Sequence, residues 1–460
     1  MTRSQRLVLI IAILASFVAF LDSSVINVAL PAITKELGGG LPLQQWVVDA
    51  YLITLSSLIL LAGSLSDLFG RIVVLRVGLI AFGVASVLIA LAPNAGLLIA
   101  LRGVQGIAAA LLVPSSLALI ISTFRDAAQS KAIGRWTAWT SASFLAGPIL
   151  GGLFVDYLSW RWVFAINVLP IAVTLYLLVI LRQKDVRKEG VKVDYLGAML
   201  GVVGLGGPVF ALIEQGNFGW GSPMILAPFI VGILSFIAFI WWQRRAAHPM
   251  LPLEIFSDRN FAWGNLATLF IYGALSIGGF IVVIFLQQVA GFPATIAALA
   301  FLPVSLANVF LSGLFGSLSG RYGPRLFMTL GPIVAGLGFL LFLTMQKEVN
   351  YWLMVLPGVL VFSIGIAITV APLTAGILGS IPPEQAGIGS ATNNAVARIA
   401  GLITIALLGV VIAGTLDVES YHRVLIVTAA LFFIGGLVSF IGIRNPQRDA
   451  VPAGEEQPAA

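Results

Sequence analysis

The sequence predicts an all-α integral membrane protein that crosses the bilayer about fourteen times. Hydrophobic residues make up 59% of its 460 residues, and Asp, Glu, Lys and Arg together only 10%, whereas soluble chains carry about 25% charged residues. A soluble fold of this length could not cover its surface with so few charges. The apolar residues also form long runs, and a helix needs about 20 of them to cross roughly 30 Å of hydrocarbon. Lipid is therefore the expected solvent for most of this surface.

The predicted spans are separated by polar residues or by Gly and Pro. They cover residues 7–30, 44–66, 73–92, 96–121, 137–157, 163–182, 195–214, 223–243, 261–286, 293–318, 325–345, 351–378, 386–414 and 424–443. Transmembrane β-barrels would instead show alternating segments of about ten residues. The first run is interpreted as an uncleaved span and not as a secretory signal, because its apolar residues continue through 25–31.

The charges between the spans predict the orientation. With the N-terminus in the cytoplasm, 19 of the 25 basic residues fall in inner connections and 4 in outer ones, and the other two lie within spans. Because cytoplasmic loops retain Lys and Arg, both termini of this multi-pass protein of the cell membrane are expected in the cytoplasm. The same excess accounts for the net charge of +6 without a nucleic-acid partner. The tail 444–460, rich in Pro, Glu and Ala, is predicted to be disordered.

Metal, disulfide and enzyme chemistry find no support in the composition. The chain has no Cys, and its two His, His248 and His422, lie in polar connections. This excludes disulfides and thiolate metal sites. Clusters of His and acidic residues that would indicate an enzyme are also missing from the sequence. We expect no cofactor and no metal, and the expected partners are a small-molecule substrate, protons and the lipid bilayer around a monomer.

An internal repeat predicts two related halves. Residues 63–71 (Gly-Ser-Leu-Ser-Asp-Leu-Phe-Gly-Arg) recur at 316–324 as Gly-Ser-Leu-Ser-Gly-Arg-Tyr-Gly-Pro, with five identical positions. A weaker echo links 114–134 with 372–389 at nearly the same offset. Paired bundles with such repeats are typical of transporters. The predicted organisation is an N-terminal six-helix bundle (1–182), two extra transmembrane helices with linkers (183–258) and a C-terminal six-helix bundle (259–443).

Ionisable side chains within spans are candidates for function, because each costs at least about 2.5 to 3.5 kcal/mol at mid-bilayer. At about 1.5 Å per residue, Asp22, Asp49 and Arg102 fall at one depth, about 8 to 9 Å from the outer edge. An arginine between two carboxylates can release or capture a proton when a pair separates. Alternatively, Arg102 only pins its helices together, or Asp49 is a solvated residue at the mouth. Asp156 and Glu214, at span ends, are expected to be solvated.

Other polar groups are candidates for lining a central cavity. Arg398 lies near the middle of its span with Asn394 one turn before it, and it can bind either an anionic substrate group or a backbone carbonyl. Aromatic residues in membrane helices also serve in packing and at the interface, so their assignment to a cavity competes with those roles. The further candidates are Asn27, Trp46, Tyr51, Trp136, Trp139, Gln287, Gln288, Asn308 and Asn393.

Several motifs together resemble those of the major facilitator superfamily, and within it the family of fourteen-span drug:proton antiporters. Residues 21–31 (Leu-Asp-Ser-Ser-Val-Ile-Asn-Val-Ala-Leu-Pro) resemble the first-span signature, with Ser24 in place of the usual Thr. Residues 102–106 (Arg-Gly-Val-Gln-Gly) look like the proton-coupling motif of span 4, and residues 160–167 and 212–220 resemble passages at spans 6 and 7. The resemblance covers 7–443 and implies the major facilitator fold, with two six-helix bundles and two extra helices.

The first copy of the repeat resembles the superfamily's loop motif between spans 2 and 3, whose Asp and Arg form a latch of the cytoplasmic gate. The resemblance implies a gate built from Gly63, Asp67, Gly70 and Arg71. Leu68 and Ile72 replace basic residues that are common in this motif, so a weaker latch is expected. Gly320 stands in the second copy where the first has an acid, and that half is expected to gate differently.

Residues 143–152 resemble the antiporter motif of span 5, with Ser143 in place of its leading Gly. In this superfamily the motif implies export. Proline removes a backbone hydrogen bond, and glycines allow neighbouring helices to approach closely. A hinge is therefore expected at Gly147, Pro148, Gly151 and Gly152.

Together these features predict a proton-coupled efflux antiporter that exports drugs, antibiotics or toxic metabolites by alternating access, with Asp22, Asp49 and Arg102 in proton coupling. A proton-coupled nutrient symporter of the same fold is the alternative. A channel is a remote one, because no repeated selectivity filter is found in the sequence. The second bundle has no acidic residue within its predicted spans, which argues mildly against divalent cations as substrates.

Overall fold

The computed structural model of the protein describes residues 1–181, 185, 187, 192–382 and 385–445. Within these residues all regular structure is helical, and fourteen helical segments are long and apolar enough to cross a membrane. The all-α fold class and the fourteen spans are therefore confirmed. The predicted disorder of the tail concerns residues that lie outside the described part, apart from Arg444 and Asn445.

The helices run back and forth through the molecule in chain order. The first six spans are α1 (Arg3–Leu37), α2 (Gly40–Phe69), α3 (Arg71–Ala90), α4 (Ala95–Thr123), α5 (Asp126–Tyr157) and the pair α6 (Trp162–Ala165) and α7 (Val168–Leu181). The next two are α8 (Tyr195–Phe218) and α9 (Pro223–Arg245). The last six are α10 (Arg259–Gln288), α11 (Ala294–Leu299) with α12 (Leu302–Tyr322), α13 (Pro324–Leu341), α14 (Leu356–Leu378), α15 (Ala386–Ala406) with α16 (Leu408–Ile412), and α17 (Val418–Gly442).

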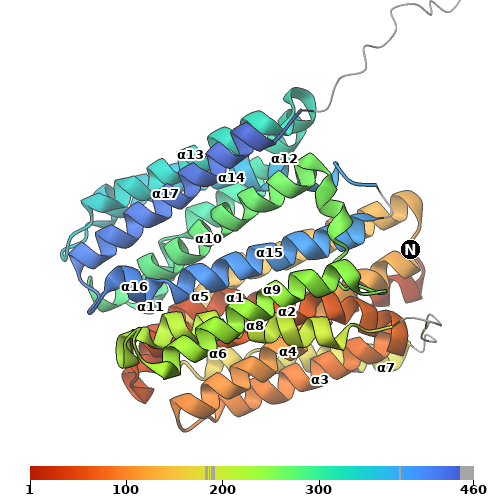
Figure 1. The fold of residues 1–460 in the computed structure, drawn as a ribbon, viewed down its shortest axis with the longest axis horizontal. Helices are drawn as coiled ribbons and strands as arrows, with labels where there is room; N and C mark the ends of the chain where they lie inside the picture. The colour runs from red at the N-terminus through yellow and green to blue at the C-terminus, as the bar shows by residue number, and fades with distance from the viewer. Residues whose placement is uncertain (182–184, 186, 188–191, 383–384, 446–460) are drawn as a thin grey trace, which may run out of the picture.

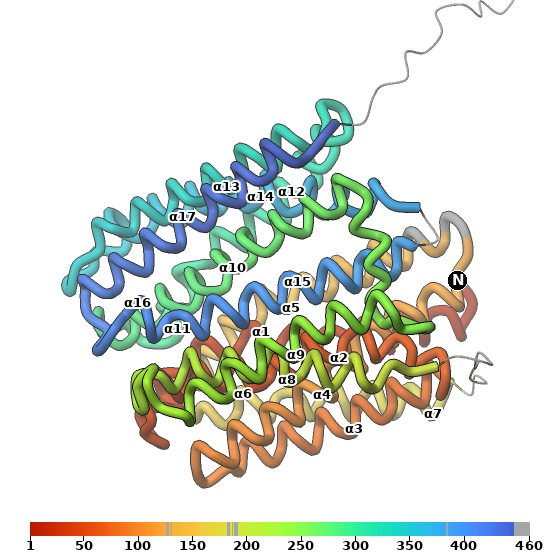
Figure 2. The backbone as a smooth tube through the Cα atoms, in the orientation of Figure 1, coloured from red at the N-terminus to blue at the C-terminus, as the bar shows by residue number. Residues whose placement is uncertain are grey.

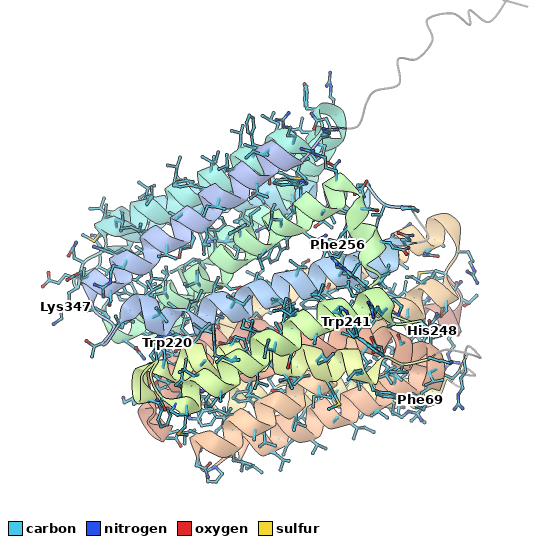
Figure 3. All side chains as sticks on the ribbon, in the orientation of Figure 1. Phe69, Trp220, Trp241, His248, Phe256 and Lys347 are labelled. Carbon is cyan, nitrogen blue, oxygen red and sulfur yellow. The ribbon has the colours of Figure 1, made fainter. Side chains whose placement is uncertain are left out.

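The first and the last helix meet the same end of the molecule. Figure 1 shows that α1 begins and α17 ends on one side, as an even number of spans requires. We call this side the proximal end and the opposite side the distal end. In Figure 3, Phe69 and His248 mark the proximal end, whereas Trp220 and Lys347 mark the distal end.

Helices α2 and α4 pack closely because small residues lie between them. A Cβ at Gly106 of α4 would overlap the Thr54 hydroxyl and the Tyr51 carbonyl of α2. Thr54 Oγ1 uses this proximity to donate a hydrogen bond of 2.8 Å to the carbonyl of Gly103. Tight packing and interhelical hydrogen bonds are the main forces between helices in lipid, where no hydrophobic effect draws them together. These contacts fix the relative rotation of α2 and α4, and with it the position of the side chains described below.

The two extra helices pack against each other and against the first helices. Gly207 of α8 and Gly232 of α9 lie so close that a Cβ at either would overlap the other helix. Trp46 of α2 donates a hydrogen bond of 2.7 Å from Nε1 to Glu214 of α8, and Asn217 donates a second one of 2.8 Å to the same carboxylate. Glu214, expected to be solvated, is thus half-buried and bonded to α2. Trp46 faces the extra hairpin through this bond.

The two copies of the repeat fold alike at the proximal end. Gly70 connects α2 to α3 with φ 100°, and Gly323 connects α12 to α13 with φ 86°, a left-handed region that favours glycine. Each glycine is covered by a side chain that follows the last helix of its half. Asp185 accepts hydrogen bonds from the Ile72 and Val73 N–H groups (3.2 and 2.9 Å), and Asn445 accepts one of 3.1 Å from that of Arg325.

Candidate functional site

Arg102 of α4 is the largest fully buried side chain of the described residues, with 1% of its surface exposed. Its Nη1 donates hydrogen bonds of 2.6 Å both to Asp22 Oδ2 and to Gln105 Oε1, and its Nε donates one of 2.8 Å to the Val47 carbonyl. The guanidinium carbon also lies 4.4 Å from the centre of the Tyr51 ring. A buried charge is tolerated only when it is paired and hydrogen-bonded, and Arg102 meets both conditions.

Asp22 of α1 is the partner of this charge and is also 1% exposed. Its second oxygen, Oδ1, accepts hydrogen bonds of 3.0 Å each from Gln105 Nε2 and Asn167 Nδ2. Ser86 Oγ accepts further bonds from the same two amides, at 2.9 and 3.4 Å. The ion pair is thus closed by neutral groups from α3, α4 and the turn between α6 and α7. A separation of α1 from α4 would break the bonds that Asp22 accepts from Arg102 and Gln105.

Sequence reasoning did not select the neutral members Ser86, Gln105 and Asn167. Gln105 lies three residues after Arg102, a spacing that places both side chains on one helix face. Asn167 closes the sequence passage 160–167 that resembles a family motif. Both signals were present in the sequence, whereas an isolated serine in an apolar helix carries none.

Asp49 lies apart from this network, and the expected placement of Arg102 between two carboxylates is not what the structure shows. Asp49 has no exposed surface, and neither of its carboxylate oxygens has a hydrogen-bond partner among the described residues. The rotation of α2 explains this difference. The Tyr51 ring of α2 lies against the Arg102 guanidinium, and two residues turn a helix by about 200°, so Asp49 lies on a different face of α2.

The other cavity candidates separate into several groups. Trp136 packs on α1 through a hydrogen bond of 3.1 Å to Ser16 Oγ, while the Trp139 side chain is 61% exposed. Asn393 joins α15 to α10 by donating to Asn265 Oδ1 (3.1 Å) and Thr268 Oγ1 (2.9 Å).

Three candidates remain on single helices or at the distal end. Asn308 donates to the Val304 carbonyl of its own helix, and Asn27 is half-buried on α1. Gln288 is exposed at the distal end of α10. Of the remaining candidates, Tyr51 contacts Arg102 of the ion pair, and Asn394 is bonded to Arg398.

Arg398 lies on α15, a helix that contacts both α2 of the first six spans and α10 of the last six. Its guanidinium carbon is 5.7 Å from the centre of the Phe20 ring of α1, and Tyr51 of α2 and Tyr272 of α10 lie in its surroundings. Its Nε donates a long hydrogen bond of 3.4 Å to Oδ1 of Asn394, which lies one turn earlier on the same helix.

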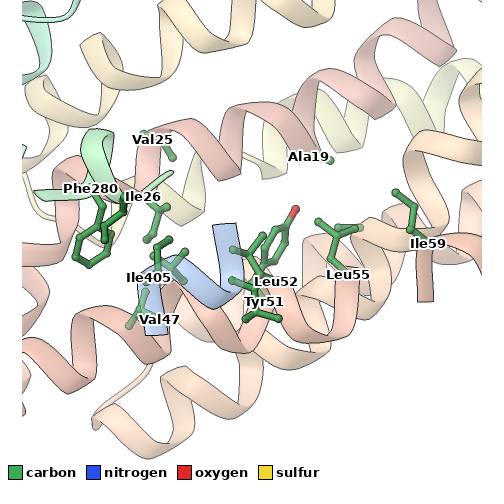
Figure 4. Close-up of a cluster of buried hydrophobic side chains, with 14 of the residues drawn as sticks. Ala19, Val25, Ile26, Val47, Tyr51, Leu52, Leu55, Ile59, Phe280 and Ile405 are labelled. Carbon is green, nitrogen blue, oxygen red and sulfur yellow. The ribbon is translucent and has the colours of Figure 1, made fainter. Parts of the chain in front are cut away.

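At the distal end, hydrogen bonds join helices of the first six spans to helices of the last six. Gln45 Nε2 of α2 donates to the carbonyls of Ile405 (2.6 Å) and Ala406 (3.1 Å) of α15. Gln287 Nε2 of α10 donates to the Val28 carbonyl of α1 (3.2 Å). Apolar side chains pack beside these bonds, as Figure 4 shows for Ile405 next to Val47.

Asp156 is exposed, as the sequence predicted, and it also makes a contact across this end. It accepts hydrogen bonds from the backbone N–H groups of Ala294 (2.9 Å) and Thr295 (2.8 Å) at the start of α11. Helices α5 and α11 are in contact, and Figure 2 shows α11 at the distal end of the molecule. A cavity of about 510 Å³ lies at this seam and is lined by residues that include Lys35, Asp156, Gln287 and Phe292.

The residues of the antiporter-like motif occupy the two interfaces of α5. Cβ atoms at Gly147 and Gly151 would overlap Ser24 and Val25 of α1, and one at Gly152 would overlap the backbone of Thr295. The α5 helix is continuous through Pro148. The glycines therefore permit close contact with α1 on one side and with α11 on the other.

The gate-motif residues lie at the proximal turn between α2 and α3. Arg71 Nη2 is 3.4 Å from Asp67 Oδ1, and Arg71 Nη1 donates a hydrogen bond of 3.0 Å to the Ala118 carbonyl of α4. Gly70 makes the turn itself, whereas a Cβ at Gly63 would meet no described atom within 4 Å. These contacts tie three helices together at the proximal end.

Fourteen spanning helices, a repeated turn and a buried ion pair are the features of a polytopic transporter with paired helix groups. The family model of the Major Facilitator Superfamily matches residues 12–405 of the chain. The chain belongs to this superfamily and is a multi-pass membrane protein that acts on small molecules.

Relatives and solved structures agree with this assignment. The multidrug resistance protein Stp of Mycobacterium tuberculosis (strain CDC 1551 / Oshkosh) is 34% identical over 91% of this chain and 78% of its own length. The methylenomycin A resistance protein of Bacillus subtilis (strain 168) is 34% identical over 88% of this chain and 87% of its own. Among solved structures, a D-xylose-proton symporter has a TM-score of 0.68 at 14% identity, covering 96% of this chain and 98% of its own. That similarity concerns the fold.

Proposed function

We propose that this protein is a proton-coupled antiporter that exports drugs, antibiotics or toxic metabolites from the cell. The observation that carries the proposal is the Asp22–Arg102 ion pair, which is buried in the membrane and closed by neutral donors. Ionisable groups at such depth commonly serve proton relays. The relatives named for multidrug resistance and for methylenomycin A resistance support export as the direction.

The contacts of the pair suggest how a proton would be coupled to movement. Protonation of Asp22 removes its charge, and the ion pair then loses most of its attraction to Arg102. Arg102 keeps its bonds to Gln105 and the Val47 carbonyl, so it stays on α4 while α1 is released. Ser24 of α1 donates a hydrogen bond of 3.0 Å to the Ser143 carbonyl of α5. The release of α1 would thus be passed to α5 and to its contact with α11.

The orientation and the organisation are part of this proposal. We place both termini and the proximal end in the cytoplasm of a plasma-membrane protein, as the distribution of basic residues supports. The two six-helix groups on either side of the α8–α9 hairpin would rock against each other. In the described arrangement the distal end is held together, and Asp67 and Arg71 would close the proximal end in the opposite state. Asp49, enclosed and without a donor, would take part as a second proton-binding group.

The test uses inverted membrane vesicles that contain the full chain and a dye or antibiotic found in a susceptibility panel. Transport driven by an imposed pH gradient should be lost in Asp22→Asn and Arg102→Ala. Arg423→Gln is a matched control, because this exposed arginine pairs with Glu419 at the distal end. Full pH-driven export by both variants would show that the coupling is assigned to the wrong residues. Uptake that increases with inward proton flow would instead favour the nutrient symporter.

A further inference from the structure

We propose that the substrate site between the helix groups selects amphipathic molecules that carry a carboxylate or a similar anionic group, and that Arg398 binds this group. The inference rests on the proposed export function and names the class of substrate. Arg398, the aromatic residues around it and the balance of charges within the spans support it.

The first observation is that Arg398 lacks the partners that Arg102 has. Arg102 uses Nε and Nη1 in three hydrogen bonds of 2.8 Å or less. Arg398 makes a single bond, from Nε to Asn394 Oδ1 at 3.4 Å, and within the described residues no carboxylate or carbonyl accepts a bond from its Nη atoms. Its two Nη groups remain available as a planar fork, a geometry that matches a carboxylate. This also favours an anion over the backbone carbonyl that the sequence left as an alternative.

The second observation is the surroundings of this arginine. Phe20 of α1 lies over the guanidinium, and Tyr51 and Tyr272 lie nearby. Phe20 also packs on Phe144 of α5, with 5.7 Å between ring centres. These residues come both from the first six spans (α1, α2 and α5) and from the last six (α10 and α15). A ligand at Arg398 would therefore pair its anionic group with the guanidinium and place its apolar body against aromatic rings, as small-molecule sites commonly do.

The third observation is the balance of charges that face this region. The Asp22 carboxylate is neutralised by Arg102, and Asp49 has no exposed surface through which to attract a cation. In the described part of α10 to α17, the only acidic residue within a helix is Glu419, in the first turn of α17. Arg398 therefore has no carboxylate partner among the described residues, and its unpaired positive charge attracts anions and repels lipophilic cations.

The experiment compares two dyes that differ only in this group: rhodamine B, which carries a free carboxylate, and its ethyl ester, a cation. Binding to the purified full-length protein is measured by fluorescence anisotropy, and transport by loading of inverted vesicles. We expect the wild type to bind rhodamine B at least about ten-fold more tightly than the ester. Arg398→Gln should reduce this ratio to near one. Arg398→Lys should keep part of it, since lysine retains the charge and loses the fork. Arg423→Gln should leave the ratio unchanged.

Equal or tighter binding of the ester by the wild type would overturn the proposal, as would a ratio that survives Arg398→Gln. Failure to bind either dye would also count against it, because an amphipathic carboxylate is the class assigned. The wild-type ratio does not depend on the folding of any variant, and monodisperse Arg398→Lys protein provides a second check. Export that depends on Asp22 but does not distinguish the dyes would refute this inference alone. Selective binding without pH-driven export would refute the proton coupling alone.

Discussion

Asp156 of α5 accepts a hydrogen bond of 2.8 Å from the backbone N–H of Thr295, at the start of α11. Asp156 and Thr295 are 139 residues apart in the sequence, so this bond joins two helices that are distant along the chain. Together with the bonds of Gln45 and Gln287, it connects helices of the first six spans to helices of the last six at the distal end. For an exporter that alternates between two states, these bonds must break whenever the distal end opens.

Asp156→Ala should therefore shift the protein toward states with an open distal end. Lys35 and Gln288 line the distal cavity from α1 and α10, and the chain has no native cysteine, so both can be replaced by cysteine and spin-labelled. We expect a larger fraction of long distances between the labels in Asp156→Ala. Asp156→Asn, which keeps one acceptor oxygen, should have a smaller effect. An unchanged distance distribution in the alanine variant would mean that Asp156 does not hold this end.

Gly106→Ala should destabilise the protein, because the added methyl group overlaps the Tyr51 carbonyl. Overpacking of this kind costs about 1 to 3 kcal/mol. The matched control is Gly63→Ala, where a Cβ meets no described atom within 4 Å. In detergent, the first variant should show a lower apparent melting temperature than the wild type and the second should not. Equal melting temperatures would contradict the close packing of α2 and α4.

Asn167→Leu should weaken proton-coupled export, because it removes one of the two amide donors to Asp22 Oδ1. An incompletely satisfied buried group costs about 1 to 3 kcal/mol, so we expect pH-driven transport to fall by about ten-fold or more. Asn217→Leu, at an exposed asparagine bonded to Glu214, is the control. The measurement is the rate of pH-driven transport in vesicles with equal protein content. A wild-type rate in Asn167→Leu would show that Asn167 does not contribute to proton coupling.

Asp185→Ala should loosen the start of α3, and Asn445→Ala the start of α13. Loss of a capping side chain costs about 0.5 to 2 kcal/mol, and a carboxylate is further favoured at a helix N-terminus by the helix dipole. Hydrogen exchange followed by mass spectrometry should show faster exchange at 72–73 in the first variant and at 325 in the second. Each variant serves as the control for the other. Faster exchange at both turns in one variant would indicate general destabilisation.

The sequence predicted the number of spans because span length and apolarity are local properties of the chain. It placed their ends less well. The first span was predicted at 7–30, yet α1 runs from Arg3 to Leu37. Its start is stabilised by a capping box between Thr2 and Gln5, and the helix continues past Pro31. The helical turns at each end of α1 extend beyond the apolar run, so apolarity alone does not predict where the helix begins and ends.

The candidate site was predicted only in part, and the reason lies in helix rotation. Asp22 and Arg102 were found because charges are rare in apolar spans. Ser86 was missed because a serine in an apolar helix gains a role only through its neighbours. Asp49 was placed at the correct end, but depth along a helix does not say which face a residue occupies. That face depends on contacts such as the one between Gly106 and Tyr51.

The cavity at the distal seam offers a way to stop the transport cycle without occupying the substrate site. It lies where α5 meets α11, and Asp156 and Lys35 provide one acidic and one basic group on its wall. In the proposed orientation it opens to the outside of the cell, so an inhibitor would not have to cross the membrane. A molecule bound there would lock the seam, and added substrate would not compete with it. Such non-competitive inhibition would remain effective whichever substrate the protein exports.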